Sequence, residues 1–305
     1  MSADRAIVEG GSTALPRVLV DVGAKVARPA RRRRGGSRWW VHASLIAAIA
    51  LIAFPLYYAF AISTQSLAEV TSVPPRLTPS WHLWANYVAA WHKARLGRLL
   101  LNSLVMATGI AVGKIAISIL SAFAIVYFDF RGKQVVFWMI FITLMLPVPV
   151  RIMSTYEVIS TLGWIDTYWG LTVPLIASAT ATFLFRQFFQ TVPDSLAEAA
   201  QLDGAGPLRF LWSFLLPLSW TNVAALFVIL FIYGWNEYLW PLMITNSEEM
   251  RTVVIGIEKL VPRGGGEIPE WNIIMAVAMM ALLPPVAVIL FMQRWFVKGL
   301  IETEK

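Results

Sequence analysis

Long apolar segments separated by short polar ones recur along the chain. Six of them approach the roughly 20 residues that a helix needs to cross the hydrocarbon core of a bilayer. Lipid offers backbone amides no other partner, so each segment must be helical. The segments cover about 39–62, 99–126, 135–150, 168–185, 216–239 and 273–291. This pattern predicts an all-α, polytopic membrane protein whose six transmembrane helices form one domain over residues 39–305.

The composition agrees with a chain that is solvated largely by lipid. Of its 305 residues, 58% are hydrophobic and 14% are charged, whereas soluble domains have about 45–50% apolar and about 25% charged residues. This difference excludes a disordered chain, a coiled coil and most soluble enzyme folds. The sequence contains no cysteine, which excludes disulfides, thiolate metal sites and cysteine nucleophiles.

The distribution of lysine and arginine predicts the topology. A net charge of +7 would also suit a nucleic-acid-binding protein, but in a membrane protein the cationic residues more often set the orientation of the spans. With six spans, 16 Lys and Arg residues fall on the side of the two termini and 8 on the other side. We therefore expect both termini in the cytoplasm, with the lipid bilayer and not nucleic acid as a partner.

Residues 1–38 form a basic tail that has little apolar periodicity and contains the run Arg31–Arg34. We interpret the tail as a disordered cytoplasmic anchor that obeys the positive-inside rule. Two other interpretations stay open. The arginine run could bind anionic lipid or nucleic acid, or the segment could be a signal peptide cleaved at Ala59-Phe60-Ala61. The apolar run is longer than in signal peptides, which favours an uncleaved span.

Candidate chemistry is sparse along the sequence. The nearest match to a phosphate-binding loop runs from Gly109 to Gly113 and Lys114, but it is one residue short and lies inside a span. Close helix packing through a G-x-x-x-G spacing explains these glycines better. The histidines lack the spacing of metal ligands, and no G-x-S-x-G elbow occurs. We expect the chain to move a solute, without a metal site, and any ATP to be hydrolysed by another subunit.

The segment 192–217, between the fourth and fifth spans, has the pattern of two short helices joined by a turn. Pro193 suits the first turn of a helix, and Ser195 and Glu198 have the spacing of a capping box. Gly204 and a following Gly-Pro pair would end this helix and let a second one start. On the residues alone, a solvated connector is the better interpretation of this segment.

A resemblance changes that interpretation. The segment Glu198-Ala199-Ala200-x-x-Asp203-Gly204-Ala205, followed by Leu216-Pro217, resembles the EAA loop of ABC-importer permeases. In that family the loop inserts into a groove of a cytoplasmic ATPase subunit and acts as a ball joint. The resemblance implies that Glu198 is a polar anchor to the ATPase, that Ala199 and Ala200 form a packing face, and that Gly204 makes the turn. Asp203, Ala205 and Pro217 complete the coupling motif.

The resemblance extends over about residues 40–305. The segments Asn102-Ser103-Leu104 and Tyr233-Gly234-Trp235-Asn236-Glu237 look like carbohydrate-uptake permeases of the MalG type, and Phe137-Trp138-Met139-Ile140 is similar to their glycerol-3-phosphate branch. This implies the MetI-like fold of type I ABC importers. The implied substrate is sn-glycerol-3-phosphate or a glycerophosphodiester. A permease for a neutral sugar or oligosaccharide stays open, and an ATP-independent secondary transporter is a distant alternative.

The resemblance also implies an assembly in the bacterial inner membrane. It would contain a homologous second permease subunit, two copies of an ABC ATPase and an extracytoplasmic substrate-binding protein. ATP and Mg²⁺ would bind to the ATPase, so this chain would be a non-catalytic subunit without a cofactor. In MalG-type subunits the loop before the last span, here about 246–271, reaches into the binding protein. Gly264-Gly265-Gly266 would give this loop a flexible tip, although an ordinary connector is an equally good interpretation of the sequence.

Four polar residues at membrane depth are candidates for the substrate path. Asn236 and Glu237, near the end of the fifth span, would line the pore or lie at the interface. Lys114 would pair with a carboxylate, snorkel to the surface or meet an anionic substrate. Arg151 would draw phosphate toward the pore or anchor the third span at the interface.

Overall fold

The structure of the protein is a computed structural model. It describes residues 39–143, 148–264, 266 and 268–302. Every regular element in this part of the chain is a helix, as the sequence predicts. The basic tail over 1–38 lies outside the described residues.

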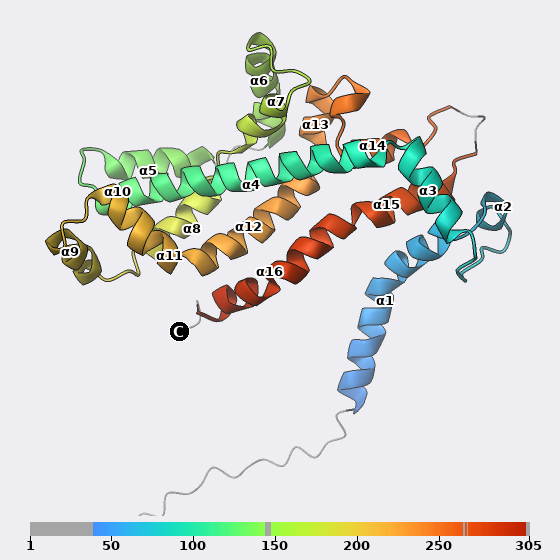
Figure 1. Cartoon of the computed structure of the whole chain (residues 1–305), viewed down its shortest axis with the longest axis horizontal. Helices are drawn as coiled ribbons and strands as arrows, with labels where there is room; N and C mark the ends of the chain where they lie inside the picture. The colour runs from blue at the N-terminus through green and yellow to red at the C-terminus, as the bar shows by residue number, and fades with distance from the viewer. Residues whose placement is uncertain (1–38, 144–147, 265, 267, 303–305) are drawn as a thin grey trace, which may run out of the picture. The chain divides into compact units, whose positions relative to one another are not determined.

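Long helices alternate with short ones in the order shown in Figure 1. The longer helices are α1 (Trp39–Ser63), α3 (Leu83–Lys93), α4 (Leu96–Tyr127), α5 (Lys133–Ile142), α6 (Val148–Thr161), α8 (Ala179–Phe189), α12 (Trp220–Trp235), α15 (Trp271–Ala281) and α16 (Leu283–Glu302). The shorter ones are α2 (Leu67–Val70), α7 (Tyr168–Thr172), η2 (Val173–Leu175), α9 (Asp194–Leu202), α10 (Pro207–Phe210), η3 (Leu211–Leu215), α11 (Leu216–Leu218), α13 (Leu239–Ile244), η4 (Glu248–Met250) and α14 (Val253–Lys259).

Five of the six predicted spans coincide with helices that are long and apolar enough to cross a membrane. Within the described ranges, three continuous stretches qualify, Trp39–Ser63, Leu96–Tyr127 and Trp271–Gln293, and two more qualify as pairs of helices joined by a bend. The remaining position holds α5, which is apolar but only 10 residues long. The all-helical membrane fold is confirmed, while the number of six spans stays a prediction.

Two of the predicted spans are bent. In the fourth, α8 meets the preceding helical segment at 50°. The reason is local, because Pro174 interrupts regular amide pairing and Ser178 caps a new helix, its Oγ accepting a hydrogen bond from the amide of Ala181 at 3.2 Å. In the fifth, α12 meets the segment before it at 75°. The straight membrane helix therefore starts at Trp220 and ends at Trp235, inside its predicted limits.

The third predicted span is divided between two helices. α5 ends at Ile142 and α6 begins at Val148, so the predicted limit at 150 was wrong and falls inside α6. α6 continues to Thr161 and contains two charged residues, Arg151 and Glu157. These charges interrupt the apolar pattern, which is why hydropathy alone did not show this helix.

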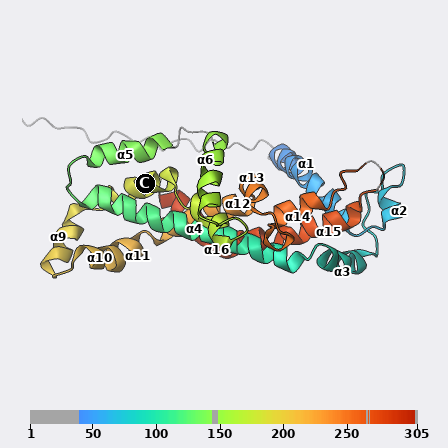
Figure 2. The ribbon, with the colours of Figure 1, turned by 90° about the horizontal axis from the view of Figure 1, so that it is seen from above.

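The chain forms two compact units, Met1–Ile52 and Ala53–Lys305. The described part of the first unit is the N-terminal portion of α1, whose side chains are exposed. In the second unit α4 is the central helix, and it packs most extensively against α8 and α12. Figures 1 and 2 both show α9, α10 and α11 near one end of α4 and α3 and α14 near the other.

Small residues allow the close packing of α4. A Cβ atom added at Gly113 would lie 2.4 Å from Cγ2 of Ile176, just after η2. One at Gly109, a turn earlier, would lie 3.0 Å from Cγ2 of Thr172 in α7. The G-x-x-x-G spacing is therefore a helix-packing surface, which confirms the interpretation made from the sequence.

A buried amide joins three segments at the N-terminal end of α4. Asn102 is completely buried, and its Nδ2 donates to the carbonyl oxygens of Glu249 at 2.7 Å and Arg251 at 2.9 Å. Its Oδ1 accepts a hydrogen bond from the hydroxyl of Tyr168 at 2.7 Å. This one side chain connects α4, α7 and the segment before α14, and its partners satisfy a polar group that would otherwise be costly to bury.

A capping box shapes the loop after α1. The amide of Ser66 donates to Oε2 of Glu69 at 2.9 Å, and the amide of Glu69 donates to Oγ of Ser66 at 3.3 Å. Ser80 donates to the same carboxylate at 3.1 Å, and Arg76 forms an ion pair with it. The backbone hydrogen bond from Ser66, followed by the side-chain contacts, lowers the pKa of Glu69 and outweighs the opposing effect of desolvation.

Candidate functional sites: coupling loop and membrane cavities

The 192–217 loop contains the helix–turn–helix that its sequence predicts. α9 is followed by Gly204, whose φ of +74° is in the left-handed region that favours glycine, and α10 starts shortly after it. The amide of Gly204 donates to the carbonyl of Gln201, and the amide of Ala205 donates to that of Ala200, both at 2.9 Å. This pair of bonds is a Schellman motif, so the turn is fixed by backbone geometry.

The start of α9 differs from the prediction. Pro193 occupies the N-cap position, and no side-chain hydrogen bond caps this helix. Ser195 and Glu198 both lie inside α9, so the predicted capping box was wrong. The helix begins at Asp194, whose carboxylate is favourable in the first turn.

α9 has one face exposed and one face against the rest of the chain. Glu198, Ala199, Leu202 and Asp203 are exposed, and Leu202 is 90% exposed although it is apolar. Ala200, by contrast, is 2% exposed. Of the alanine pair that was predicted to pack against the ATPase, only Ala199 therefore lies on the surface, while Ala200 holds α9 against this chain.

Apolar exposure continues beyond Gly204. Leu208 in α10 is 66% exposed and Trp212 in η3 is 63% exposed. Together with Leu202, these side chains leave large apolar groups uncovered on the loop. In a membrane protein, exposed apolar groups of this kind are covered by lipid or by a partner subunit.

Pro217 lies at the end of the loop, where the chain bends into α12. Proline has no amide hydrogen, and its ring collides with the carbonyl four residues earlier in a regular α-helix. The preceding residues Leu211–Leu215 accordingly form a wider π-helical turn. Ser219 follows, fully buried, with its Oγ donating to the carbonyl of Leu215 at 2.5 Å. Pro217 therefore helps to fix the direction in which the loop leaves the membrane helix.

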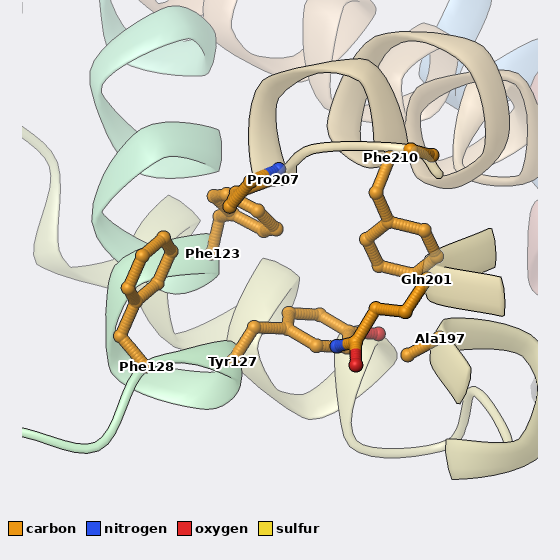
Figure 3. A pocket seen from close by; sticks show the side chains of 8 residues that line it. Phe123, Tyr127, Phe128, Ala197, Gln201, Pro207 and Phe210 are labelled. Atoms are coloured by element: carbon orange, nitrogen blue, oxygen red, sulfur yellow. The ribbon is translucent and has the colours of Figure 1, made fainter. Parts of the chain in front are cut away.

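A cavity of about 240 Å³ lies between this loop and the C-terminal end of α4. Figure 3 shows Phe123 and Tyr127 of α4 beside Gln201 of α9 and Phe210 of α10. The rings of Tyr127 and Phe210 meet edge to face with centroids 5.3 Å apart, and the Tyr127 hydroxyl donates to the carbonyl of Phe189 at 3.4 Å. One aromatic cluster thus joins the loop to α4 and α8.

Two adjacent cavities lie further along α4, at membrane depth. The smaller has a volume of about 180 Å³ and the larger about 590 Å³. Lys114, Arg151, Ala177 and Tyr233 line both of them. α4, α6 and α12 thus bring together two of the predicted path residues, Lys114 and Arg151, beside the break that precedes α8.

Lys114 is an unusual residue for this depth. Its side chain is 8% exposed, and its Nζ lies over the ring of Tyr233 at 4.1 Å from the centroid, in a cation–π contact. The ion pairs found in the described part of the chain do not include Lys114. Its ammonium therefore contacts an aromatic face and no carboxylate directly, while Glu237 attracts it and Arg151 repels it at longer range.

The other two predicted path residues follow the end of α12. Glu237 lines the smaller cavity together with Lys114 and Arg151. Asn236 is exposed and is not among the residues that line either cavity, and its Nδ2 donates to the carbonyl of Ile232 at 2.9 Å. The structure therefore groups Glu237 with the two cations and places Asn236 at the helix end.

The glycine-rich loop between α14 and α15 is open. Gly264 and Gly266 are exposed, and a Cβ atom added at either would have no neighbour within 4 Å; Gly265 lies outside the described residues. Arg263, next to these glycines, forms an ion pair with Glu258 of α14. The hydrogen bond and the charge of Glu258 raise the pKa of Arg263. The base of the loop is thus held to α14, and there is open space beside the two described glycines.

Three residues of these sites were missed by the sequence analysis as site residues. Tyr233 lies in a recognised motif, but no sequence signal pairs an aromatic ring with a lysine on a distant helix. Tyr127 resembles an ordinary interfacial aromatic residue, and Phe210 an ordinary core residue. Across the described ranges, no group of three His, Asp or Glu side chains converges on a point where a metal ion could bind.

The family described as "Binding-protein-dependent transport system inner membrane component" matches residues 114–302. This range includes the coupling loop, the bent fifth span and the residues that line both membrane cavities. The chain therefore belongs to this family, and it is a permease subunit of an ABC importer with the predicted MetI-like fold.

Relatives of known name share most of the chain. The "sn-glycerol-3-phosphate transport system permease protein UgpE" of Rhizobium meliloti (strain 1021) is 57% identical over 271 residues, which are 87% of this chain and 96% of the relative. The protein of the same name from Yersinia enterocolitica serotype O:8 / biotype 1B is 54% identical over 278 residues, which are 89% of this chain and 99% of the relative. The similarity is therefore spread over the whole permease domain and not confined to one motif.

A solved structure shares the fold. A chain of a bacterial ABC transporter involved in the import of the acidic polysaccharide alginate superposes with a TM-score of 0.74 at 23% identity, over 85% of this chain and 96% of that chain. A second structure of a bacterial alginate ABC transporter, in complex with a pentasaccharide-bound periplasmic protein, gives a TM-score of 0.58 at 16% identity, over 84% and 93%. These likenesses confirm the fold.

Proposed function

We propose that this chain forms half of the pore of an ABC importer that takes up sn-glycerol-3-phosphate, or a glycerophosphodiester, by alternating access. The observation that carries the proposal is identity of 54–57%, over nearly their full length, to permeases named for sn-glycerol-3-phosphate. Two cations in the membrane cavities suit an anionic solute. A permease for a neutral sugar or oligosaccharide is the alternative. An ATP-independent secondary transporter would have no use for a coupling loop.

The proposed assembly has four kinds of components. A homologous second permease (UgpA-like) completes the pore, two copies of an ATPase (UgpC- or MalK-like) bind ATP and Mg²⁺, and an extracytoplasmic binding protein (UgpB-like) delivers the solute. This chain performs no chemical step and holds no cofactor. Both termini and the 192–217 loop lie in the cytoplasm, which is supported by the 16 Lys and Arg residues on that side against 8 on the other.

Coupling runs through the exposed face of α9. Glu198 and Asp203 offer carboxylates to basic groups of the ATPase, and Ala199 and Gly204 allow its backbone to approach closely. Ala200 and Ala205 are buried within this chain and keep α9 in place while the ATPase moves the loop. Because Pro217 and Tyr127 connect the loop to α12 and α4, movement of the loop reaches the helices that line the pore.

The opposite end of α4 faces the binding protein in this proposal. Figures 1 and 2 show α14 and the loop after it at the other end of α4 from α9, which supports contact of Gly264-Gly265-Gly266 with the binding protein. Between the two ends lies the substrate path, for which we keep Asn236, Glu237, Lys114 and Arg151. Only a path that is presented differently in the two states of the pore can use the free energy of ATP.

The coupling role is tested with Glu198→Lys in the reconstituted importer. We expect ATP-driven uptake and substrate-stimulated ATPase activity to be lost together, because the anchor charge is reversed, while the subunit still inserts and assembles. Glu157→Lys, which reverses another exposed carboxylate on α6, is the matched control and should leave both activities unchanged. Normal uptake by Glu198→Lys would contradict docking through this residue.

The substrate is tested with the partner binding protein. We expect it to bind sn-glycerol-3-phosphate tightly in calorimetric titration, and we expect vesicles containing the whole importer to accumulate that compound only with ATP. Tight binding of maltose without affinity for glycerol-3-phosphate would instead assign the chain to the neutral-sugar permeases.

A further inference from the structure

The charged residues that line the larger membrane cavity are all cationic. Among the described residues that line it are two cations, Lys114 and Arg151, several hydroxyl side chains, and no carboxylate. Ser121 from α4 and Thr180 and Thr182 from α8 are among those hydroxyl residues. With a volume of about 590 Å³, this cavity is large enough for a solute of a few carbon atoms and one phosphate group.

The two cations have different charged groups, an ammonium and a guanidinium, and phosphate can bind to both of them. The Lys114 side chain is more than nine-tenths buried, and the Tyr233 ring holds its ammonium at the boundary of both cavities. Arg151, on α6, is exposed and lines both cavities too. An ammonium acts as a compact point charge, whereas a guanidinium offers a planar fork of donors to two oxygens of one phosphate.

A purely structural role does not explain Lys114. An ionised side chain at membrane depth is costly, and one that serves packing alone is normally paired with a carboxylate. Glu237 lines only the smaller cavity and does not form an ion pair with Lys114 in the described structure. Glu237 attracts Lys114 only at longer range, and Arg151 repels it. A lysine that contacts no carboxylate directly and faces a cavity with a second cation is suited to meet an anion that arrives and leaves.

We infer that Lys114 and Arg151 form a transient site in the pore wall that binds the phosphate group of the transported solute. This inference rests on the proposed function and deepens it. Tyr233 is a positioning residue that holds the Lys114 ammonium, and the hydroxyl groups of Ser121 and Thr180 donate to the remaining phosphate oxygens. Glu237, which lines the smaller cavity beside Tyr233, offers the two cations an alternative partner and so favours release of the phosphate.

The test uses the whole importer in vesicles, with radiolabelled sn-glycerol-3-phosphate as the probe. Lys114→Met and Arg151→Gln should each slow ATP-driven uptake by at least about tenfold, the effect of losing one charge-assisted hydrogen bond. Stimulation of the ATPase by the loaded binding protein should persist in both, because the coupling loop is unchanged. Lys114→Arg should recover most of the uptake. Lys133→Met, which removes a cation paired with Asp129 outside the cavities, is the matched control.

The outcomes separate this inference from the proposed function. Uptake at the wild-type rate by both variants would overturn the phosphate site while leaving the importer intact. Loss of uptake together with loss of ATPase stimulation would show a structural role and also overturn it. A defect that appears only in vesicles containing phosphatidylglycerol, and not in pure phosphatidylcholine, would assign the cations to a lipid headgroup. Absence of ATP-driven uptake by the unmodified importer would instead refute the proposed function.

Discussion

Replacing Gly113 by alanine tests the packing that surrounds Lys114. The new Cβ would lie 2.4 Å from Cγ2 and 2.8 Å from Cβ of Ile176, whereas carbon atoms in contact are about 3.5–4.0 Å apart. Because the Cβ of Ile176 moves only with its backbone, the segment after η2 must shift by about 1 Å. Overpacking of this kind costs about 1–3 kcal/mol, against a gain of about 1 kcal/mol in helix propensity. We expect a net loss of up to about 2 kcal/mol.

A double-mutant cycle measures this contact. The purified importer is unfolded by titration with SDS in mixed micelles, for the wild type, Gly113→Ala, Ile176→Ala and the double variant. Removing Cγ2 of Ile176 relieves the shorter of the two contacts, so the double variant should be more stable than the sum of the single effects by about 1 kcal/mol. Gly109→Ala is the matched control, because its Cβ would be 3.0 Å from a methyl group and should be nearly neutral.

Two results would refute this reasoning. If helix propensity decided the outcome, Gly113→Ala would gain stability, and such a gain would show that the close approach of α4 to Ile176 is absent. Additivity in the cycle within about 0.5 kcal/mol would show that the two residues do not touch. Since Ala177 follows Ile176 and lines both membrane cavities, we also expect Gly113→Ala to slow uptake without changing docking of the ATPase.

Two further predictions concern the ends of the structure that lie away from the coupling loop. Asn102→Leu should destabilise the subunit by at least about 2 kcal/mol in the same SDS titration, because it leaves two carbonyls and a hydroxyl without their partner. Tyr168→Phe removes only one hydroxyl and should cost less. Equal losses of stability in the two variants would contradict the hydrogen-bond network. The lowered pKa of Glu69 means that its carboxylate stabilises the 66–82 loop above the ordinary value near 4.5, and that this contribution disappears as the pH falls through the lower, folded value. Hydrogen–deuterium exchange of this loop, corrected for intrinsic rates, should therefore become faster in that acidic range. In Glu69→Gln the loop should already exchange faster at pH 7, and its exchange should change little as the pH falls. A variant with the same pH profile as the wild type would show that the carboxylate does not stabilise the loop.

The sequence was sufficient for features that depend on local chemistry. Hydropathy located the long apolar helices of the described ranges. The left-handed turn at Gly204 was predictable because only one residue type tolerates it at low cost. Bends were not predictable in the same way. Pro174 and Pro217 both lie in apolar segments, and whether a proline kinks a helix or ends it depends on the helices packed beside it.

The membrane cavities required the three-dimensional structure. Lys114 and Arg151 were candidates because each is a charge in an apolar region, but the sequence left several partners open for each. Their convergence depends on α6, which hydropathy did not show, and on the close approach of α4 to η2 at Gly113. Tyr233 could not be predicted as the partner of Lys114, because the contact joins two helices that are far apart along the chain.

The unbroken length of α4 has a mechanical consequence. Its 32 residues extend over roughly 48 Å, well beyond the hydrocarbon core of about 30 Å, while the two neighbouring segments that contain α8 and α12 are bent. A long straight helix that is packed tightly near its middle, at Gly109 and Gly113, can rotate as a rigid body about that point. A tilt of about 10° would move each tip by roughly 4 Å, in opposite directions. Under the proposed coupling mechanism, displacement of the end of α4 beside α9 would move the opposite end in the opposite direction.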